Sequence, residues 1–398
     1  MSPLVPVLAT SRVVVCVGAG GVGKTTTAAA LGLAAAREGR RAVVVTIDPA
    51  RRLADALGLI DSTGEVSTAL RPADRADPVP GADRAGPVPR AARQGRGRGP
   101  RLGANRRLGD EPVLVPGVGP GELWGVMLDP QATFDRLVHQ QAHSEEQARR
   151  ILDNPIYRNL TTSLSGTHEY LAAEKLHELH ADDRFDLVIV DTPPARHALD
   201  VLDGPSRLIR FLDHRLYRSV FAPRRGIRKA VNTATQTALR SISRLVGADL
   251  VDDVIAFFAA FEGLDDGFRR RAAEVNRLLL SPSTGFVLVT SPRYQAMRES
   301  DWLLEQLAVR RVPVSAIVVN RMTPELGPPP EPDGLPSDWS AHAQAWRTLH
   351  ELARVERAAL AAVRARHPHL PLVVVEDRGR PVNDLAGLAL LGRRLVGS

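Results

Sequence analysis

The segment Gly18-Ala-Gly-Gly-Val-Gly-Lys-Thr25 fits the pattern G-x-x-x-x-G-K-[ST] of a phosphate-binding loop, and this motif predicts the class of fold. Its glycines allow backbone N–H groups to curl around phosphate oxygens, and Lys24 can reach the β- and γ-phosphates. The Thr25 hydroxyl is placed for Mg²⁺, and a helix that begins there adds the positive end of its dipole. The residues expected to contact the nucleotide are Gly18, Gly20, Gly21, Val22, Gly23, Lys24, Thr25 and Thr26.

The segments on either side of this loop provide the context that it requires. Residues 12–17 form a continuous β-branched apolar run, which is typical of a strand buried on both faces. Residues 25–38 are rich in Ala and Leu and end before Gly39, so they predict a helix. A second apolar run follows at residues 41–47. Strand, helix and strand of these lengths predict a βαβ unit with a parallel sheet.

The rest of the chain predicts an α/β fold, a parallel-sheet P-loop core with an inserted helical subdomain. Strand-like apolar runs return at residues 122–129, 185–190, 285–290, 314–319 and 370–375. The segment 206–280 has no strand signal and shows helical spacings of Leu and Phe. We assign residues 1–64, 113–202 and 281–398 to the nucleotide-binding core, 65–112 to a low-complexity insertion and 203–280 to the helical subdomain.

The insertion differs from its surroundings in composition. Of the fifty residues at 72–121, nineteen are Pro or Gly, and the run at 73–80 is nearly repeated at 82–89. Such a stretch cannot bury enough apolar surface to offset its ordering entropy, which predicts disorder; a damaged or frame-shifted gene segment is the alternative. The seven arginines at 90–107 account for the whole net charge of +7. The high isoelectric point of the chain is therefore no strong indication that the protein binds nucleic acid.

Composition excludes several other classes. No apolar run approaches the length of a transmembrane helix, and the first residues lack the features of a secretory signal, so we expect a cytoplasmic protein, either free or peripheral to a membrane. Cys16 is the single cysteine, which excludes a disulfide framework and a cysteine-based zinc or iron–sulfur site within one subunit. Because Cys16 lies inside an apolar run, we expect it to be buried and structural.

Two aspartates follow apolar strands and are suited to act on a bound nucleotide. Asp48 comes after the run at 41–47, and Asp191 comes after the run at 185–190. Ligands of open parallel sheets gather at the carboxyl ends of the strands. A carboxylate there can hold Mg²⁺ through water or position the attacking water, whereas a helix cap or a turn residue is the structural alternative.

Together these segments resemble the ArsA-type ATPases, the anion-transporting or arsenical-pump family that includes the ATPases of guided entry of tail-anchored proteins. That family belongs to the deviant Walker A class of P-loop ATPases, with MinD and the nitrogenase iron protein as distant relatives. The resemblance covers residues 10–60 and 122–398. It implies that Asp48, in Asp48-Pro-Ala, orients the attacking water. It also implies that Asp191, in Asp191-Thr-Pro-Pro-Ala-Arg-His197, senses the γ-phosphate.

The resemblance also implies residues for the base and a dimeric site. Asn320 in Val318-Val-Asn320 matches the adenine-binding asparagine of the family, and Pro371 and Leu372 match its late adenine loop more weakly. The family's loop reads G-K-G-G-x-G-K-T, and its first lysine reaches the nucleotide of the partner subunit. This chain has Ala19 in that position. A methyl group supplies no charge to a transferring phosphoryl group.

Three interpretations of Ala19 follow. A lysine-bearing paralogue can donate its lysine in a heterodimer, which we favour. In a homodimer, Arg51 or Arg196 can substitute for it. As a third possibility, the chain binds nucleotide and hydrolyses it poorly, as a pseudo-ATPase scaffold.

The kind of client is constrained only by what the chain lacks. Arsenite requires several thiolates, and a single cysteine disfavours its transport. Tail-anchor targeting is weakened because the chain has no Cys-x-x-Cys and only four Met. Apolar stripes at 206–280 still allow a hydrophobic or membrane-protein client, although core packing is the simpler reading. We therefore predict an ATPase that binds Mg-ATP between two subunits and switches its helical subdomain, with a ParA/MinD-like positioning ATPase as a rival.

Overall fold

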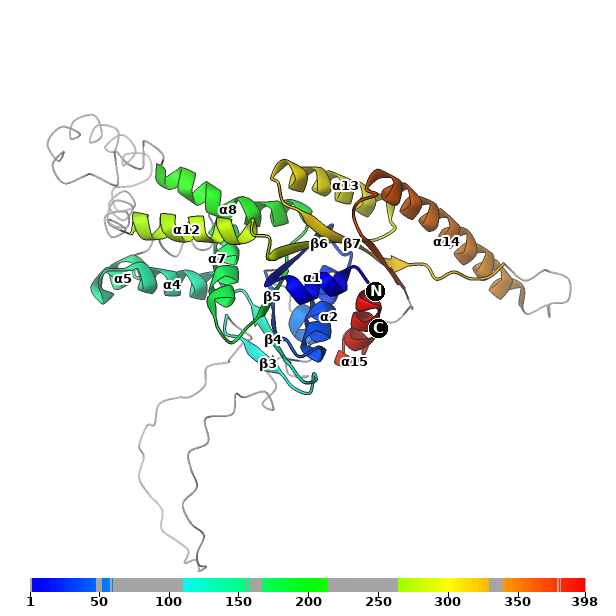
Figure 1. Cartoon of the computed structure of the whole chain (residues 1–398), viewed down its shortest axis with the longest axis horizontal. Helices are drawn as coiled ribbons and strands as arrows, with labels where there is room; N and C mark the ends of the chain where they lie inside the picture. The colour runs from blue at the N-terminus through cyan, green and yellow to red at the C-terminus, as the bar shows by residue number, and fades with distance from the viewer. Residues whose placement is uncertain are drawn as a thin grey trace, which may run out of the picture.

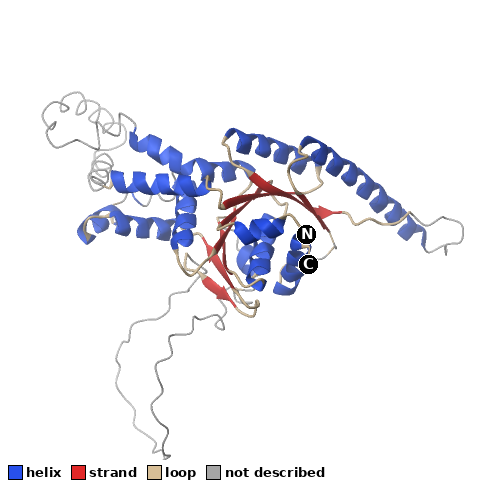
Figure 2. Cartoon of the chain, in the orientation of Figure 1, coloured by secondary structure: helices blue, strands red, loops and turns tan. Residues whose placement is uncertain are grey.

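A mainly parallel sheet forms the centre of the molecule, and helices pack on both of its faces (Figure 1 and Figure 2). The arrangement confirms the α/β fold predicted from the loop and its flanking strands. The computed structural model describes residues 2–47, 52–57, 59, 110–154, 157, 167–213, 264–328, 339–377, 379 and 381–397.

The eight strands of the sheet follow the order β3-β4-β2-β5-β1-β6-β7-β8. Seven of them run parallel and are those that the apolar runs predict, whereas β3 pairs antiparallel with β4 at the edge. Strand β3 was not predicted from the sequence, because its three residues stand in a Pro- and Gly-rich stretch. The strands are β1 Val13–Gly18, β2 Arg41–Thr46, β3 Val113–Val115, β4 Glu122–Met127, β5 Leu187–Asp191, β6 Thr284–Thr290, β7 Val314–Met322 and β8 Leu372–Glu376.

Helices α1, α2 and α15 contact one another on one face of the sheet, whereas α7, α8 and α13 pack on the other (Figure 1). Helix α2 directly follows the loop and is almost wholly buried, which explains its Ala-rich sequence. The described helices are α1 Leu4–Thr10, α2 Lys24–Arg37, α3 Arg52–Ala56, α4 Pro130–Gln141, α5 Glu145–Leu152, α7 Thr167–Ala181, α8 Ala195–Asp213, α12 Asp265–Leu279, α13 Tyr294–Val309, α14 Ser340–Arg366 and α15 Leu385–Val396.

Strand β1 is enclosed on both faces, since all six of its residues are buried. Val14 and Cys16 belong to the apolar cluster that contains α2, and the alternate residues Val13, Val15 and Val17 belong to the cluster on the opposite face. This alternation is the period-2 pattern of a strand, and both faces are apolar because helices cover both. Burial raises the pKa of the Cys16 thiol, and the charge of Asp191 raises it further, so the predicted buried structural cysteine is confirmed.

A helical unit lies beside the sheet and differs in extent from the expected helical subdomain. Helices α4, α5, α7, α8 and α12 enclose a third apolar cluster, which includes Leu137, Tyr157 and Phe268. The unit therefore recruits residues from 130–157, which the sequence analysis assigned to the core. Helix α8 also runs without a break across the expected boundary at residue 203. Residues 214–263 of the expected subdomain lie outside the described residues.

Asp110, which the sequence analysis placed in the insertion, fastens the segment before β3 to this helical unit. Its side chain is only 3% exposed. One carboxylate oxygen accepts hydrogen bonds from Thr133 Oγ1 at 2.8 Å and from Arg136, and the other accepts from the backbone N–H of Asp129 at 3.2 Å. The last residues of the expected insertion that the structure describes, from Asp110 onward, therefore begin with a buried contact to α4. Residues 65–109 lie outside the described residues.

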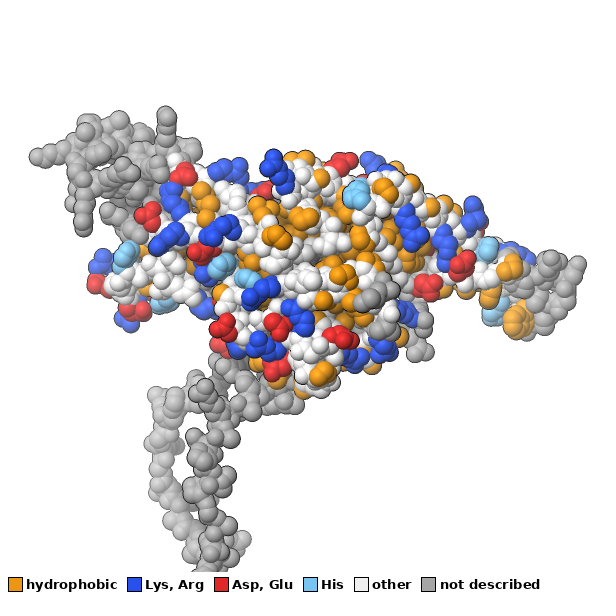
Figure 3. Space-filling view, viewed as in Figure 1, with side chains coloured by type: hydrophobic (Ala, Val, Ile, Leu, Met, Phe, Trp, Pro, Cys, Tyr) orange, Lys and Arg blue, Asp and Glu red, His pale blue; other side chains and the backbone are white. Residues whose placement is uncertain are grey.

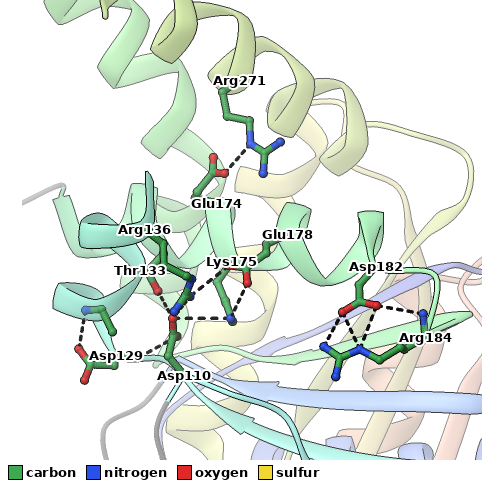
Figure 4. Close-up of polar contacts among 11 residues, drawn as sticks. Asp110, Asp129, Thr133, Arg136, Glu174, Lys175, Glu178, Asp182, Arg184 and Arg271 are labelled. Atoms are coloured by element: carbon green, nitrogen blue, oxygen red, sulfur yellow. Dashed lines mark hydrogen bonds and ion pairs between the residues drawn. The ribbon is translucent and has the colours of Figure 1, made fainter. Parts of the chain in front are cut away.

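Lys175 of α7 joins the same group of charges (Figure 4). Its Nζ lies 3.6 Å from Asp110 Oδ2 and 3.1 Å from Glu178 Oε1, and its side chain is 1% exposed. Arg136 also reaches Glu178, at 3.2 Å. Two cations and two carboxylates therefore balance one another across α4, α7 and the strand-side segment. We call Asp110, Arg136, Lys175 and Glu178 the α4–α7 ion cluster.

Helix α14 extends away from the sheet on the side opposite to this unit (Figure 1). Trp346 Nε1 donates to the Gly327 carbonyl at 3.0 Å, and Glu356 accepts from the Thr323 N–H at 2.7 Å. Leu349, Leu352 and Val355 stay exposed on it. On the face drawn in Figure 3, hydrophobic side chains gather over the middle of the molecule, with charges of both signs around them. No helix in the described ranges has both the length and the apolar character needed to cross a membrane.

Candidate nucleotide-binding site

The loop after β1 depends on glycines at defined positions. Gly18, Gly21 and Gly23 have φ angles of +153°, +73° and +97°, which L side chains rarely adopt. A Cβ on Gly18 would lie 1.9 Å from the carbonyl oxygen of Val289 in β6. A Cβ on Gly23 would lie 2.3 Å from Asn320 Nδ2. The loop can therefore turn tightly against β6 and β7 only without side chains at these two positions.

Substitution of Gly18 tests this packing. We expect Gly18→Ala to lower the free energy of unfolding by at least about 2 kcal/mol, because the methyl group would collide with the backbone of the neighbouring strand. Gly21→Ala is the matched control, since its φ is also positive but no atom lies within 4 Å of the added Cβ. Its cost should be about 1 kcal/mol, from the backbone conformation alone. Urea titration of the three proteins measures both values, and equal losses would contradict the steric argument.

Lys24 begins α2 and points back into the loop. Its Nζ donates to the Ala19 carbonyl at 2.8 Å, and the residue is 7% exposed. The ammonium group is therefore enclosed by the loop, beside the first N–H groups of α2, which favour an anion. Thr25 and Thr26 follow in the first turn of the helix and are partly exposed.

Asp191 brings β5 and β2 into contact with the start of α2. Its Oδ2 accepts hydrogen bonds from Thr25 Oγ1 at 2.7 Å and from Thr46 Oγ1 at 2.9 Å. Asp191 is 1% exposed. The next residue, Thr192, is fixed to β1, because its Oγ1 donates a hydrogen bond to the Cys16 carbonyl at 2.7 Å. The parallel register places Thr46 directly beside Asp191, so the two oxygens meet because the strands end together. This group consists of hard oxygen donors, which are the ligands that Mg²⁺ prefers.

Asn320 closes the loop from the other side. Its Nδ2 donates to the Val22 carbonyl at 2.9 Å from the carboxyl-terminal part of β7. The next residue, Arg321, donates from Nη1 to the Gly21 carbonyl at 3.1 Å. The structure thus brings Asn320 to the loop, as the resemblance requires, while its contact with adenine stays a prediction.

The remaining expected site residues do not join this group. Pro371 and Leu372 lie at the amino end of β8, where the Pro371 carbonyl accepts from Ile317 N at 2.8 Å. The loop and Asn320 lie at the carboxyl ends of their strands, so the end of β8 that faces the same edge is Glu376. The structure therefore places Pro371 and Leu372 at the opposite edge of the sheet from the loop, and their contact with adenine stays a prediction. Asp48 and Arg51 lie outside the described residues.

Of the two cations considered as substitutes for the missing lysine, the structure describes Arg196. Ala19 itself is 3% exposed and packs in the apolar cluster with α2. Arg196 is exposed, with its guanidinium 5.9 Å from the ring centre of Trp302. The neighbouring His197 lies 3.8 Å from Asp200. The described contacts of Arg196 and His197 are thus with their own surroundings on α8 and α13.

Sequence reasoning missed two residues of the site. Thr46 is the last residue of β2, and a hydroxyl at the carboxyl end of an apolar strand is a signal that could have found it. Arg321 follows the expected adenine ligand directly, but its direction depends on a backbone φ of +62°. Such a conformation is uncommon for a residue other than Gly, and the sequence does not reveal it.

Known proteins are similar in sequence to this chain over most of its length. The family described as anion-transporting ATPase matches residues 11–71 and 104–330. ATPase get3 of Schizosaccharomyces japonicus is 24% identical over 307 residues, which are 77% of this chain and 72% of that protein. ATPase ASNA1 homolog 2 of Paramecium tetraurelia is 21% identical over 311 residues, 77% of this chain and 74% of that protein. ATPase GET3B of Arabidopsis thaliana is 26% identical over 315 residues, 77% of this chain and 63% of that protein.

The family match leaves out part of the low-complexity insertion and the last 68 residues, and it includes the loop, Asp191 and Asn320. It spans well over half of the chain. On this match, and on the loop geometry that accompanies it, the chain belongs to the anion-transporting ATPase family.

Proposed function

We propose that the chain binds Mg-ATP on the loop after β1 and hydrolyses it between two subunits. The observation that carries the proposal is the convergence of Lys24 with the Thr25, Thr46 and Asp191 oxygens at the carboxyl ends of three adjacent strands. Lys24 would move from the Ala19 carbonyl to the β- and γ-phosphates. The first N–H groups of α2 would bind the same phosphates.

Asp191 would hold Thr25 in place and report whether a γ-phosphate is present, since β5 leads directly into α8 of the helical unit. A Mg²⁺ ion bound beside Thr25 would neutralise charge on the phosphates. Asp48 would orient the attacking water, and Asn320 would contact adenine. A change at Asp191 can reach the helical unit because α8 begins four residues later and extends into it. We propose this as the conformational switch.

The subunit partner follows from Ala19. The site needs a cation opposite the transferring phosphoryl group, and a buried alanine supplies none. Because Arg196 is directed towards Trp302, we favour a heterodimer with a paralogue that carries the signature lysine over a homodimer. A nucleotide-binding pseudo-ATPase scaffold is the second candidate, favoured by the same alanine. A hydrophobic or membrane-protein client remains a prediction, since most of segment 206–280 lies outside the described residues.

Steady-state hydrolysis of Mg-ATP tests the proposal. The purified chain is assayed alone and after mixing with a paralogue that carries the signature lysine, with Asp48→Asn in this chain as the control. We expect the chain alone to bind ATP and to hydrolyse it slowly. Mixing with the paralogue should raise the turnover, and Asp48→Asn in this chain should abolish the part of that rise that comes from its own site.

Other results would favour other functions. Turnover by the chain alone that Asp48→Asn abolishes would favour a homodimer. Binding without turnover under both conditions would favour the scaffold. ATP-dependent retention on DNA or liposomes would favour a ParA/MinD-like positioning ATPase. A chain that binds no ATP under any condition would refute the proposal.

A further inference from the structure

The geometry points to Arg321 as the residue that covers the base end of the nucleotide: its guanidinium packs on the purine ring and fixes the base against the loop. This inference rests on the proposed ATP site and deepens it. It assigns to Arg321 a role in affinity for purine nucleotides, and no role in the transfer of the phosphoryl group.

Arg321 is held in place by both its backbone and its side chain. It has a φ of +62° and stands where the pairing of β7 with β8 shifts register, between Val319 and Met322. Its N–H donates to Asn320 Oδ1 at 3.0 Å, and its Nη1 donates to the Gly21 carbonyl at 3.1 Å. A bulge of this kind redirects a side chain that a regular strand would send elsewhere. Here it lays an exposed guanidinium along the loop.

The strand order decides which end of the nucleotide Arg321 meets. Thr46 and Asp191 end β2 and β5, which lie on one side of β1. Arg321 lies on β7, which is two strands away on the other side of β1, beyond β6. The phosphates and the oxygen donors therefore occupy the β5 side of the loop. The base and the ribose are left for the β7 side, next to the amide of Asn320.

The chemistry of the side chain fits a base better than it fits a reacting phosphate. A guanidinium is planar, always charged and weakly hydrated, and it stacks on aromatic faces. Because Nη1 is bound to a loop carbonyl, the plane is fixed before the nucleotide arrives, so little rotamer freedom is lost on binding. Asn320 can then hydrogen-bond the edge of the same ring. The two neighbouring residues would read one face and one edge of the purine.

Equilibrium binding of three probes to the full chain tests the role. ATP, ADP and inorganic tripolyphosphate are titrated against wild type and Arg321→Ala. We expect Arg321→Ala to weaken ATP and ADP by the same factor, roughly tenfold, as for loss of one base-stacking side chain. Tripolyphosphate has no base, so its affinity should stay unchanged. Where turnover is measurable, KM should rise and kcat should not fall.

Two further variants separate the contribution of ring stacking to nucleotide affinity from the contribution of the charge and from an effect on the stability of the fold. Arg321→Lys keeps the charge without the plane, so it should restore only part of the affinity. Arg321→Gly removes the side chain and relieves the left-handed backbone, so it should raise the unfolding midpoint while losing the same affinity. Arg311→Ala is the matched control. Arg311 also has a positive φ, +57°, but it belongs to the turn after α13, where its N–H donates to the Ala308 carbonyl.

The outcomes divide cleanly. Equal loss of ATP and tripolyphosphate would show that Arg321 supports the loop or the phosphates and would overturn the inference. Full rescue by Arg321→Lys, or a loss in kcat with unchanged KM, would overturn it as well. Unchanged ATP affinity in Arg321→Ala would refute it while the proposed function stands. If wild type binds ATP no better than Lys24→Met does, the proposed function itself fails.

Discussion

Replacing Lys24 by Met should weaken ATP binding at least about 100-fold and leave the fold intact. The Nζ is enclosed by the loop and lies where the N–H groups of α2 point, so it would meet the phosphates already desolvated. Loss of one partner from a buried, hydrogen-bonded charge pair weakens binding by this amount or more. Without nucleotide, the change removes a charge-assisted hydrogen bond of about 1.5–3 kcal/mol to the Ala19 carbonyl, and it also removes the desolvation cost of a buried ammonium, which offsets most of that loss.

We therefore expect the free energy of unfolding of Lys24→Met to stay within about 1 kcal/mol of wild type. Isothermal titration with ATP and urea unfolding in its absence measure the two quantities separately. A loss of stability that matches the loss of binding would mean that Lys24 is a structural residue of the loop. Thermal protection by ATP should disappear in the variant, since a ligand stabilises a protein only through its affinity for the folded state.

Replacing Lys175 by Met should have the opposite effects: it should lower the free energy of unfolding and leave the binding of phosphates unchanged. The α4–α7 ion cluster holds Lys175 and Asp110 at 1% and 3% side-chain exposure, with 3.6 Å between their charged atoms. Removal of one partner of a buried pair leaves the other charge without full compensation, and such changes cost about 3–5 kcal/mol. Because Arg136 and Thr133 still contact Asp110, we expect a value near the lower end of that range.

A double variant makes this prediction decisive. Lys175→Met combined with Asp110→Asn removes both charges, so it should be more stable than the sum of the single changes indicates. Urea unfolding of wild type, the two single variants and the double variant gives the four free energies of unfolding that the cycle compares. Tripolyphosphate binding to the folded single variant should match wild type, since the described contacts of Lys175 are with Asp110 and Glu178. Additive effects would mean that the two charges do not stabilise one another.

The part of the fold that was predicted correctly is the part fixed by local pattern. A β-branched run, a glycine loop and an Ala-rich helix are continuous in the sequence, and the seven parallel strands are apolar because helices cover both faces. The boundary of the helical unit could not be predicted in this way. Its members α4 and α5 are far from α12 in the sequence, and Asp110 is recognisable as a buried residue only when Arg136 and Lys175 are seen beside it.

The residues of the candidate site likewise fall into those that local sequence pattern determines and those that strand pairing determines. Lys24, Thr25 and Asp191 occupy positions that strand ends and one motif determine, so the sequence placed them near one another. Pro371 and Leu372 lie at the amino end of β8, and the sequence does not show which end of that strand lies level with Asn320 until the pairing with β7 is known. Arg321 was missed because its orientation comes from a register shift between β7 and β8, which depends on pairing and not on either strand alone.

The central position of β1 also has a consequence for biosynthesis. Among the strands of this sheet, residues 13–18 leave the ribosome first, yet their partners are residues 187–191 and 284–290. At about 5–20 residues per second, the second partner emerges tens of seconds after the first strand. During that time an apolar strand with unpaired edges is exposed to other chains, which is the condition that favours aggregation and chaperone binding. The segment that holds the phosphates is thus made early and completed late, so the nascent chain should acquire nucleotide-dependent protease resistance only after β6 has been released.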